Sequence, residues 1–160
     1  MIVLSALPGS GKSTWSRKFV EEHKNTHVVS SDDIRKEFFG KINCFDNEPL
    51  VWKTFIDRLN YPYDDSNEDV YVIADATNLQ NKFREYYNVN TPGFDKHVLV
   101  LFDIPYEICL IQNKMRDSEK IVPETAMEKL RKEMEEPSDE VIKLYDEVIH
   151  VTEYNKTLMK

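Results

Sequence analysis

The most constraining feature of this chain is a glycine-rich loop near its N-terminus, between an apolar run and a helix-like pattern. Apolar residues 2–4 precede the stretch Ala6-Leu7-Pro8-Gly9-Ser10-Gly11-Lys12-Ser13-Thr14, and Trp15 and Phe19 follow it at helical spacing. A strand, a turn with little side-chain bulk and a helix direct backbone N–H groups and the positive end of a helix dipole toward one point. The stretch therefore predicts a phosphate-binding loop.

Each residue type in this loop suits the binding of a nucleoside triphosphate. Gly9 and Gly11 supply the backbone freedom that a tight turn around phosphates needs. Lys12 would reach the β and γ phosphates, and the Ser13 hydroxyl would bind a Mg²⁺ ion that bridges the same oxygens. We expect ATP and Mg²⁺ to bind here, and the expected nucleotide-binding residues are Pro8, Gly9, Ser10, Gly11, Lys12, Ser13 and Thr14.

The loop departs from the usual pattern G-x-x-x-x-G-K-[ST] at one place, because Ala6 stands where the pattern has its first glycine. A methyl group is the smallest intrusion that a side chain can make. A glycine-rich turn followed by an unrelated lysine is the alternative interpretation. The aliphatic strand before the loop and the apolar helix positions after it favour nucleotide binding.

Length and composition indicate one globular domain. The chain has 160 residues, of which 41% are hydrophobic and 31% charged. It lacks an apolar run of the roughly 20 residues that a membrane span needs, and Met1 leads straight into the first strand without a basic leader, so we expect a cytoplasmic protein. The net charge of −8 argues against a long electrostatic track along nucleic acid, although one strand end could still be held.

Strand and helix patterns alternate along the rest of the chain. Apolar and β-branched runs predict buried strands at 70–75 and 98–102, and shorter signals indicate strands at 26–30 and 146–151. Helical patterns between them indicate an α/β fold with a parallel sheet of about five strands and helices on both faces. We expect residues 1–160 to form a single phosphate-loop domain of the kinase-like type with a short helical lid.

Helical periodicity also predicts which side chains face the core. Pro123 is expected at the first position of a helix, and the charged stretch 116–120 before it suits either a mobile lid or a solvated loop. The aromatic-rich stripe at 51–59 is interpreted as core. The expected inward faces are Val51, Trp52, Phe55, Ile56 and Leu59; Leu79, Phe83, Tyr86 and Tyr87; Ile108, Ile111 and Met115; and Met127, Leu130 and Met134.

Polar residues follow the predicted strands at the carboxyl edge of the sheet, where ligands of open parallel sheets bind. They should border one crevice together with the phosphate loop. These residues are Ser31, Asp32, Asp33, Asp75, Thr77, Asn78 and Asp103.

Four segments, in this order, resemble the kinase domain of the phage polynucleotide kinase-phosphatase family. They are the P-G-S-G-K-S-T-W loop, Asp32-Asp33-Ile34-Arg35, Asp75-x-Thr77-Asn78-Leu79 and Phe102-Asp103-Ile104-Pro105. The Val122-Pro123 step is also similar, so the resemblance extends from the first strand to about Pro137. A phosphatase domain is not expected within these 160 residues.

The resemblance implies transfer of the γ-phosphoryl group of ATP to a 5′-hydroxyl end of DNA or RNA. By this resemblance Asp32 would accept the proton of the attacking hydroxyl, and Arg35 would hold a phosphate of the acceptor nucleotide. Asp75, Thr77 and Asn78 would help to bind the acceptor end.

The resemblance also assigns a role to the lid. Arg116 would lie over the donor phosphates and stabilise the charge that develops during transfer. Gln112 stands where the family has a second basic lid residue, so this chain departs from the family there.

Asp32 and Arg35 also have purely structural interpretations. Asp32 could be the N-cap of a helix, and Arg35 could be its i,i+3 partner. We favour the catalytic interpretation of Asp32 because the pair opens a helix at a strand's carboxyl end, and we expect Asp33 to be the cap.

Two other functions remain open. A kinase of a small metabolite, nucleoside or nucleotide-sugar could use the same loop and the same aspartate. A phosphate-loop ATPase or switch that is not a kinase is less favoured, because the sequence contains no N-K-x-D guanine-reading motif.

Overall fold

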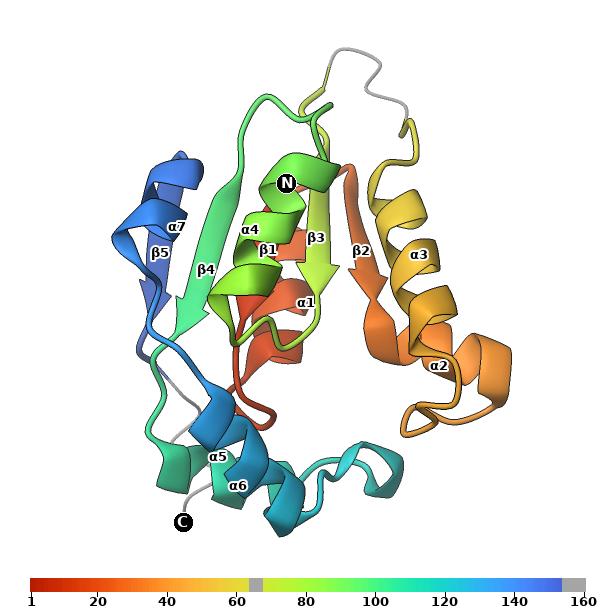
Figure 1. The fold of residues 1–160 in the computed structure, drawn as a ribbon, viewed down its shortest axis with the longest axis vertical. Coiled ribbons are helices and arrows are strands. Elements are labelled where there is room, and N and C mark those ends of the chain that lie inside the picture. Colours follow the sequence, from red (N-terminus) through yellow and green to blue (C-terminus); the bar gives the residue numbers. More distant parts are fainter. Residues whose placement is uncertain (64–67, 154–160) are drawn as a thin grey trace.

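Five parallel strands form the sheet in the centre of the molecule (Figure 1). The computed structural model describes residues 1–63 and 68–153. The order across the sheet is β2-β3-β1-β4-β5, so the chain crosses over between neighbouring strands. This arrangement confirms the predicted α/β class. The strands are β1 (Ile2–Ser5), β2 (Thr26–Ser30), β3 (Tyr71–Asp75), β4 (Val98–Phe102) and β5 (Glu147–Val151).

Helices connect the strands and cover both faces of the sheet. None of the helices in the described ranges is long and apolar enough to cross a membrane. The helices are α1 (Lys12–Glu22), α2 (Ser31–Phe39), α3 (Glu48–Leu59), α4 (Asn81–Asn90), α5 (Tyr106–Lys114), the 3-10 turn η1 (Ser118–Lys120), α6 (Glu124–Glu133) and α7 (Asp139–Leu144).

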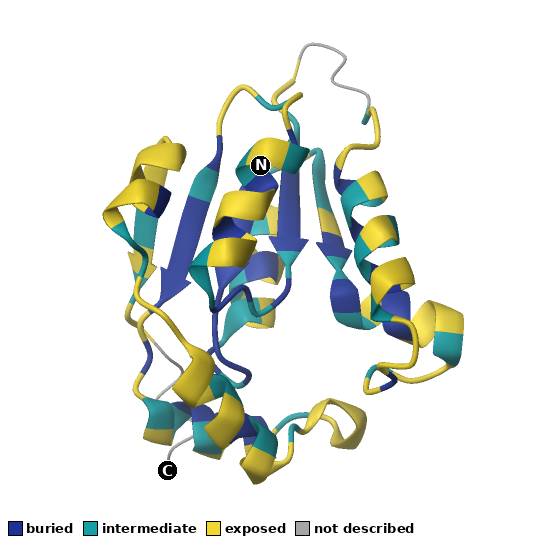
Figure 2. Ribbon diagram, viewed as in Figure 1, coloured by how far each residue is buried: buried dark blue, intermediate teal, exposed yellow. Residues whose placement is uncertain are grey.

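The sheet separates two apolar layers, because side chains of a strand alternate between its faces. Val3 of β1 packs with residues of α2, α3, α4 and α7, including Phe55. Leu4 faces the opposite layer, which α1, α5 and α6 complete with residues such as Met127. Figure 2 shows that buried residues are concentrated in the central strands. Burial on both faces explains the near-continuous apolar runs of β3 and β4.

The carboxyl ends of the strands meet at one edge of the sheet. Ser30 at the end of β2 pairs with Asp75 at the end of β3, so the segments that follow these strands start at the same level. The segment from α5 through η1 to α6 lies beyond this edge (Figure 1). The fold therefore brings the polar segments after β1, β2 and β3 together below the sheet.

The predicted inward face of α5 was right for Ile108, which packs against an apolar layer, and wrong for the other two residues. Ile111 and Met115 are exposed, whereas Cys109, Gln112 and Asn113 are buried. The reason is the close packing of α5 on the phosphate loop, which buries its polar side. The Asn113 side chain is satisfied there, because its amide donates to the Val122 carbonyl at 2.7 Å and its oxygen accepts from the Val122 N–H at 3.1 Å.

The predicted faces of α4 and α6 also need correction. Phe83 is 40% exposed and Tyr86 is 50% exposed, because Arg84 and Tyr87 occupy the buried side of α4. Pro123 is the N-cap of α6 instead of its first residue, and the exposed Met134 is the C-cap residue at its end.

Candidate active site

The phosphate loop connects β1 to α1 and is packed directly against α5. Gly9 and Gly11 have φ of 83° and 93°, the left-handed region that glycine adopts without strain. A Cβ at Gly9 would lie 2.3 Å from the Cys109 carbonyl oxygen and 2.8 Å from the Asn113 nitrogen. Position 9 therefore needs glycine for its space as well as for its backbone conformation.

Ala6 fits the loop without disturbing it. Among the described residues, left-handed φ values outside glycine occur at Asn25 and Asn78, so the backbone at Ala6 does not require glycine. The Ala6 N–H donates to the Thr77 carbonyl at 2.9 Å, and its methyl group is buried in the apolar layer beside α1. The departure from the usual loop pattern has no steric cost in this fold.

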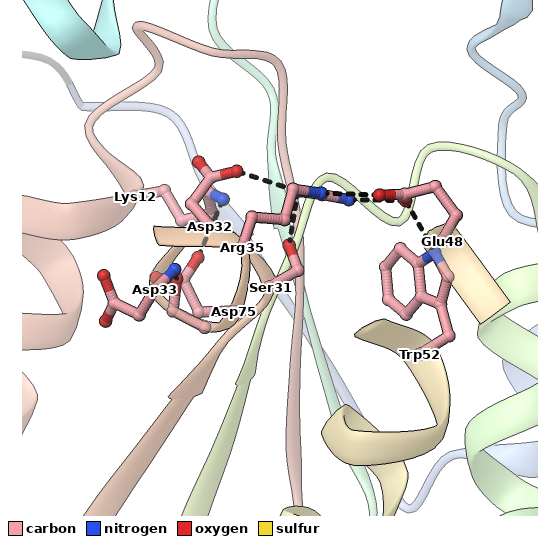
Figure 3. Close-up of polar contacts among 9 residues, drawn as sticks. Lys12, Ser31, Asp32, Asp33, Arg35, Glu48, Trp52 and Asp75 are labelled. Carbon is pink, nitrogen blue, oxygen red and sulfur yellow. Dashed lines mark hydrogen bonds and ion pairs between the residues drawn. The ribbon is translucent and has the colours of Figure 1, made fainter. Parts of the chain in front are cut away.

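Lys12 points toward the end of β3 and forms an ion pair with Asp75 (Figure 3). Its Nζ lies 2.7 Å from Asp75 Oδ1, and both side chains are mostly buried. Because the next residue, Ser13, is exposed and lines the same cavity, a hard oxygen donor lies beside the lysine. This donor is of the type that phosphate-loop proteins use for Mg²⁺.

Arg35 lies between two carboxylates on the α2 side of the cavity (Figure 3). Its Nη1 donates to Asp32 Oδ1 at 2.9 Å and approaches Ser31 Oγ at 3.4 Å. Its Nε and Nη2 donate to the two oxygens of Glu48 at 2.9 and 2.8 Å. These bonds raise the pKa of Arg35 against the effect of burial, and the Arg35 hydrogen bonds lower the pKa of Glu48.

Two aromatic rings hold the guanidinium group of Arg35 from its sides. Its central carbon lies 5.0 Å from the centre of the Phe45 ring and 5.9 Å from that of Trp52. Trp52 Nε1 also donates to Glu48 Oε2 at 3.1 Å. The cation–π contacts and the bidentate pair with Glu48 together hold the buried guanidinium group in one orientation.

Asp33 does not cap α2, contrary to the expectation from the sequence. The cap is Ser30, whose hydroxyl accepts the Asp33 N–H at 3.3 Å. Asp32 and Asp33 lie in the first turn instead, where the helix dipole favours negative charge. Burial and the nearby Asp75 and Asp32 raise the pKa of Asp33.

The segment after β3 has residues at the cavity and one residue, Asn78, in the interior. Thr77 lines the cavity. Asn78 is 4% exposed, donates to the Leu4 carbonyl at 2.8 Å and accepts from the Tyr87 hydroxyl at 2.7 Å. The expectation that Asn78 binds the acceptor is corrected, because its amide instead ties β1 to the turn before α4.

The charged segment between α5 and α6 extends over the cavity. Arg116 lines it, and burial lowers the Arg116 pKa while Asp32 and Asp75 act in the opposite direction. Lys36 of α2 donates to both oxygens of Glu119 at 2.8 and 3.0 Å, which joins η1 to α2. We call residues 116–120 the lid segment.

Gln112 of α5 also lines the cavity. Its Nε2 is buried and has no hydrogen-bond partner among the described residues. A neutral amide stands here where the resembled family has a basic residue, so this position adds a donor without a charge.

All these elements surround one cavity of about 800 Å³. The phosphate loop, the start of α2, the side of α3 at Trp52 and the lid segment form its walls. Asp103 does not contribute as expected, since it pairs with His150 at the far edge of the sheet. The predicted residues that line the cavity are Pro8, Gly9, Gly11, Lys12, Ser13, Thr14, Ser31, Asp32, Arg35, Thr77 and Arg116.

Three residues of this site were not assigned to it from the sequence. Glu48 follows Arg35 by 13 residues across an irregular loop, so no periodic pattern links the two. Trp52 was interpreted as core, and its indole is indeed half-buried while one edge faces the cavity. Asn113, which holds Val122 just beyond the lid segment, carried a signal as a polar residue in an otherwise apolar stretch of helix.

The fold and the loop define a phosphate-loop protein of the kinase-like class. The chain belongs to the family described as AAA domain (AAA_33), which matches residues 1–137.

Solved structures with this fold include kinases. A gluconokinase from Sinorhizobium meliloti 1021 is 19% identical over 94% of this chain and 81% of its own, with a TM-score of 0.60. A chain of the Pnkp1/Rnl/Hen1 RNA repair complex is 26% identical over 82% of this chain, with a TM-score of 0.70; the match spans only 42% of that chain. Kti12 from Chaetomium thermophilum in complex with ADP-AlF3 is 16% identical over 98% of this chain and 92% of its own, with a TM-score of 0.69.

Proposed function

We propose that this protein transfers the γ-phosphoryl group of ATP to a 5′-hydroxyl end of a nucleic acid. The observation that carries the proposal is the Asp32–Arg35 pair, which lies in the same cavity as the phosphate loop. A carboxylate and a phosphate-binding cation side by side suit an acceptor that has a hydroxyl group next to a phosphate.

The donor side consists of the loop, Lys12 and Arg116. The loop N–H groups and the start of α1 would bind the phosphates, and Lys12 would exchange Asp75 for phosphate oxygens. Ser13 is the side chain that would hold Mg²⁺, which when bound neutralises phosphate charge. Arg116 would add a second positive charge from the lid segment.

The acceptor side supplies the proton acceptor. The 5′-hydroxyl oxygen forms a bond to the γ-phosphorus as the bond from that phosphorus to the β-phosphate oxygen breaks, and the hydroxyl proton passes to the Asp32 carboxylate. The products are ADP and a 5′-phosphate end. Asp75 and Thr77 would border the incoming end.

Arg35 would hold the acceptor phosphate with a restricted part of its guanidinium group. Within the described residues, its hydrogen bonds to Glu48, Asp32 and Ser31 leave one N–H of Nη2 for a ligand. Glu48 would therefore act as a positioning residue that aims this remaining N–H.

The similarity to a chain of an RNA repair complex supports a nucleic-acid acceptor. The gluconokinase shares the fold at 19% identity, so a sugar acceptor is the second candidate. Transfer to a sugar would need the same residues around ATP, but Arg35 would then have to bind a group other than an acceptor phosphate.

Parallel labelling assays test the proposal. ATP labelled at the γ position is offered with 5′-hydroxyl DNA and RNA oligonucleotides, nucleosides and sugars. We expect label on an oligonucleotide and loss of transfer in Lys12→Ala, with the circular dichroism spectrum retained. Label on a sugar alone would identify a metabolite kinase, and rapid hydrolysis without any acceptor would identify an ATPase or switch.

A further inference from the structure

A second, smaller hollow lies between α3 and α4 on the outside of the sheet. Its volume is about 140 Å³ and its walls are almost entirely apolar. A cavity of about 150 Å³ with apolar walls is large enough for one benzene ring. We call this hollow the α3–α4 groove, and its lining residues are Trp52, Ile56, Phe83, Tyr86 and Tyr87.

Two of these aromatic side chains are not part of the hydrophobic core. Phe83 and Tyr86 are 40% and 50% exposed and belong to neither apolar layer of the sheet. Tyr87, in contrast, is buried in the floor and bonded to Asn78. Exposed aromatic side chains gathered around a hollow are typical of a binding surface.

The groove and the candidate active site share one lining residue. Trp52 lines both the large cavity and the groove. On the cavity side its indole faces Arg35 at 5.9 Å, and on the groove side it stacks with Phe83 at 6.4 Å between ring centres, with an angle of 18° between the planes. The Trp52 ring is therefore in contact with Arg35 and with the groove at the same time.

The groove wall is held in place before any ligand arrives. Trp52 donates to Glu48 and packs edge-on against the fully buried Phe55 at 5.3 Å. Lys82 places its ammonium group 5.0 Å from the centre of the Phe83 ring, so a cation lies beside the hollow. Rigid aromatic faces next to a positive charge suit a base with its attached phosphate.

We propose that the α3–α4 groove stacks the base of a nucleotide that follows the 5′-terminal one, so that the acceptor is a single-stranded polynucleotide. This inference rests on the proposed function. The net charge of −8 gives the protein little general attraction for a phosphate backbone, so stacking has to supply much of the affinity for the strand. A sugar or a mononucleotide would leave the groove empty.

Acceptor length is the variable that tests the inference. The intact protein is assayed with a nucleoside 3′-monophosphate, which reaches only Arg35, and with single-stranded oligonucleotides of increasing length. Oligonucleotides with one abasic position then locate the stacked base. We expect the oligonucleotides to have the lower KM, and one abasic position to abolish that advantage.

Groove variants separate stacking from general damage. Phe83→Ala and Tyr86→Ala should raise the KM for oligonucleotides by about fivefold or more, and leave kcat and the KM for the monophosphate unchanged. Phe38→Ala is the matched control, since Phe38 is an equally exposed phenylalanine, at 39%, on α2. Anisotropy of a labelled oligonucleotide, without ATP, should report the same loss of binding.

Each outcome decides between distinct conclusions. If nucleic acids are phosphorylated but the groove variants affect both acceptors equally or not at all, the groove is not a base site. A change in oligomeric state with unchanged KM would make the groove a contact between copies of the chain and overturn the inference. If no nucleic acid is phosphorylated by the wild-type protein, the proposed function itself fails.

Discussion

At the scale of single residues, Asp32 is a carboxylate with two potential tasks. It pairs with the buried Arg35, yet about half of its own side chain is exposed to the cavity. Since Ser30 caps α2, the helix does not depend on Asp32 for its first hydrogen bonds. Loss of the Asp32 charge can therefore be separated from loss of the helix.

We predict that Asp32→Asn reduces transfer to a 5′-hydroxyl end by at least about 100-fold, the lower end of what a general base contributes. The amide cannot take up the proton, but it can still accept a hydrogen bond from Arg35. ATP binding and the melting temperature should change little. Asp33→Asn is the control in the same helical turn, and an equal, mild effect of both substitutions would make Asp32 structural.

We predict that the stability contributed by Glu48 depends on pH. Its pKa is lowered from 4.5 chiefly by the Arg35 hydrogen bond, so its stabilising contribution is complete above about pH 4.5 and is lost as the pH falls through the lowered value. Glu48→Gln should lower the free energy of unfolding by about 1–3 kcal/mol at pH 7, because it leaves Arg35 poorly paired.

Urea unfolding of both proteins between pH 3 and 7 measures this difference. The difference in free energy of unfolding between the wild type and Glu48→Gln should become smaller as the pH falls toward 3. Glu37→Gln is the control, because Glu37 forms a similar two-bond pair with Arg58 on the surface. A difference in free energy of unfolding that does not change with pH would contradict the inference that ionised Glu48 stabilises the fold.

The Arg35–Glu48 pair also shows why part of the site could not be predicted. Asp32 and Arg35 were found because they follow a predicted strand at the carboxyl edge of the sheet and match a motif of the family that the chain resembles. Glu48 reaches Arg35 only through the path of the loop that follows Gly40, and loop paths leave no periodic signal in a sequence.

At the scale of elements, the lid segment has a firm base and a loosely attached tip. Asn113 fixes Val122, two residues beyond the C-terminal end of this segment, by two hydrogen bonds. The tip is attached to α2 by the exposed Lys36–Glu119 pair, and ion pairs of this kind contribute little in water. Opening at the tip should therefore be easy.

We predict that nucleotide orders the lid segment. Trypsin should cleave after Arg116 and Lys120 more slowly with ATP and Mg²⁺ present, because Arg116 would then be held by the phosphates. Arg116→Ala should slow transfer by at least about tenfold. Lys36→Ala is the control, which should speed cleavage only without nucleotide, and equal cleavage with and without ATP would exclude the lid role.

Element types were predicted better than element faces. The buried strands were found because apolar runs such as 98–102 are unambiguous, and the structure confirms β4 there. The faces of α4 and α5 were wrong in part: Phe83, Tyr86, Ile111 and Met115 are exposed. Arg84, Gln112 and Asn113 are buried in these helices instead. A polar side chain can be buried when it forms hydrogen bonds in the interior. The periodicity of apolar residues then predicts the wrong buried face.

At the scale of the whole molecule, Arg84 joins parts that are distant in sequence. It is 2% exposed and donates to Ser5 Oγ at 3.0 Å and to the Asn78 carbonyl at 3.1 Å. It also donates to Asn81 Oδ1 and to the Glu135 carbonyl, both at 2.9 Å. One side chain thus connects the end of β1 to the segment that follows α6.

We predict that Arg84→Met lowers the free energy of unfolding by more than about 3 kcal/mol, since several buried acceptors lose their donor at once. Arg58→Ala, at an exposed arginine with two charged hydrogen bonds, should change stability little. Chemical denaturation checks both. An Arg84→Met protein as stable as the wild type would show that these contacts are dispensable.

The contrast between Ala6 and Gly9 changes how relatives of this chain should be recognised. A search pattern that insists on glycine at the first loop position would reject this chain, although its backbone there accepts a methyl group. The strict demand falls on position 9, where α5 leaves no room for a side chain. Sequences that keep a glycine at that place, and an α5 segment that can pack on it, are the better candidates to share this site.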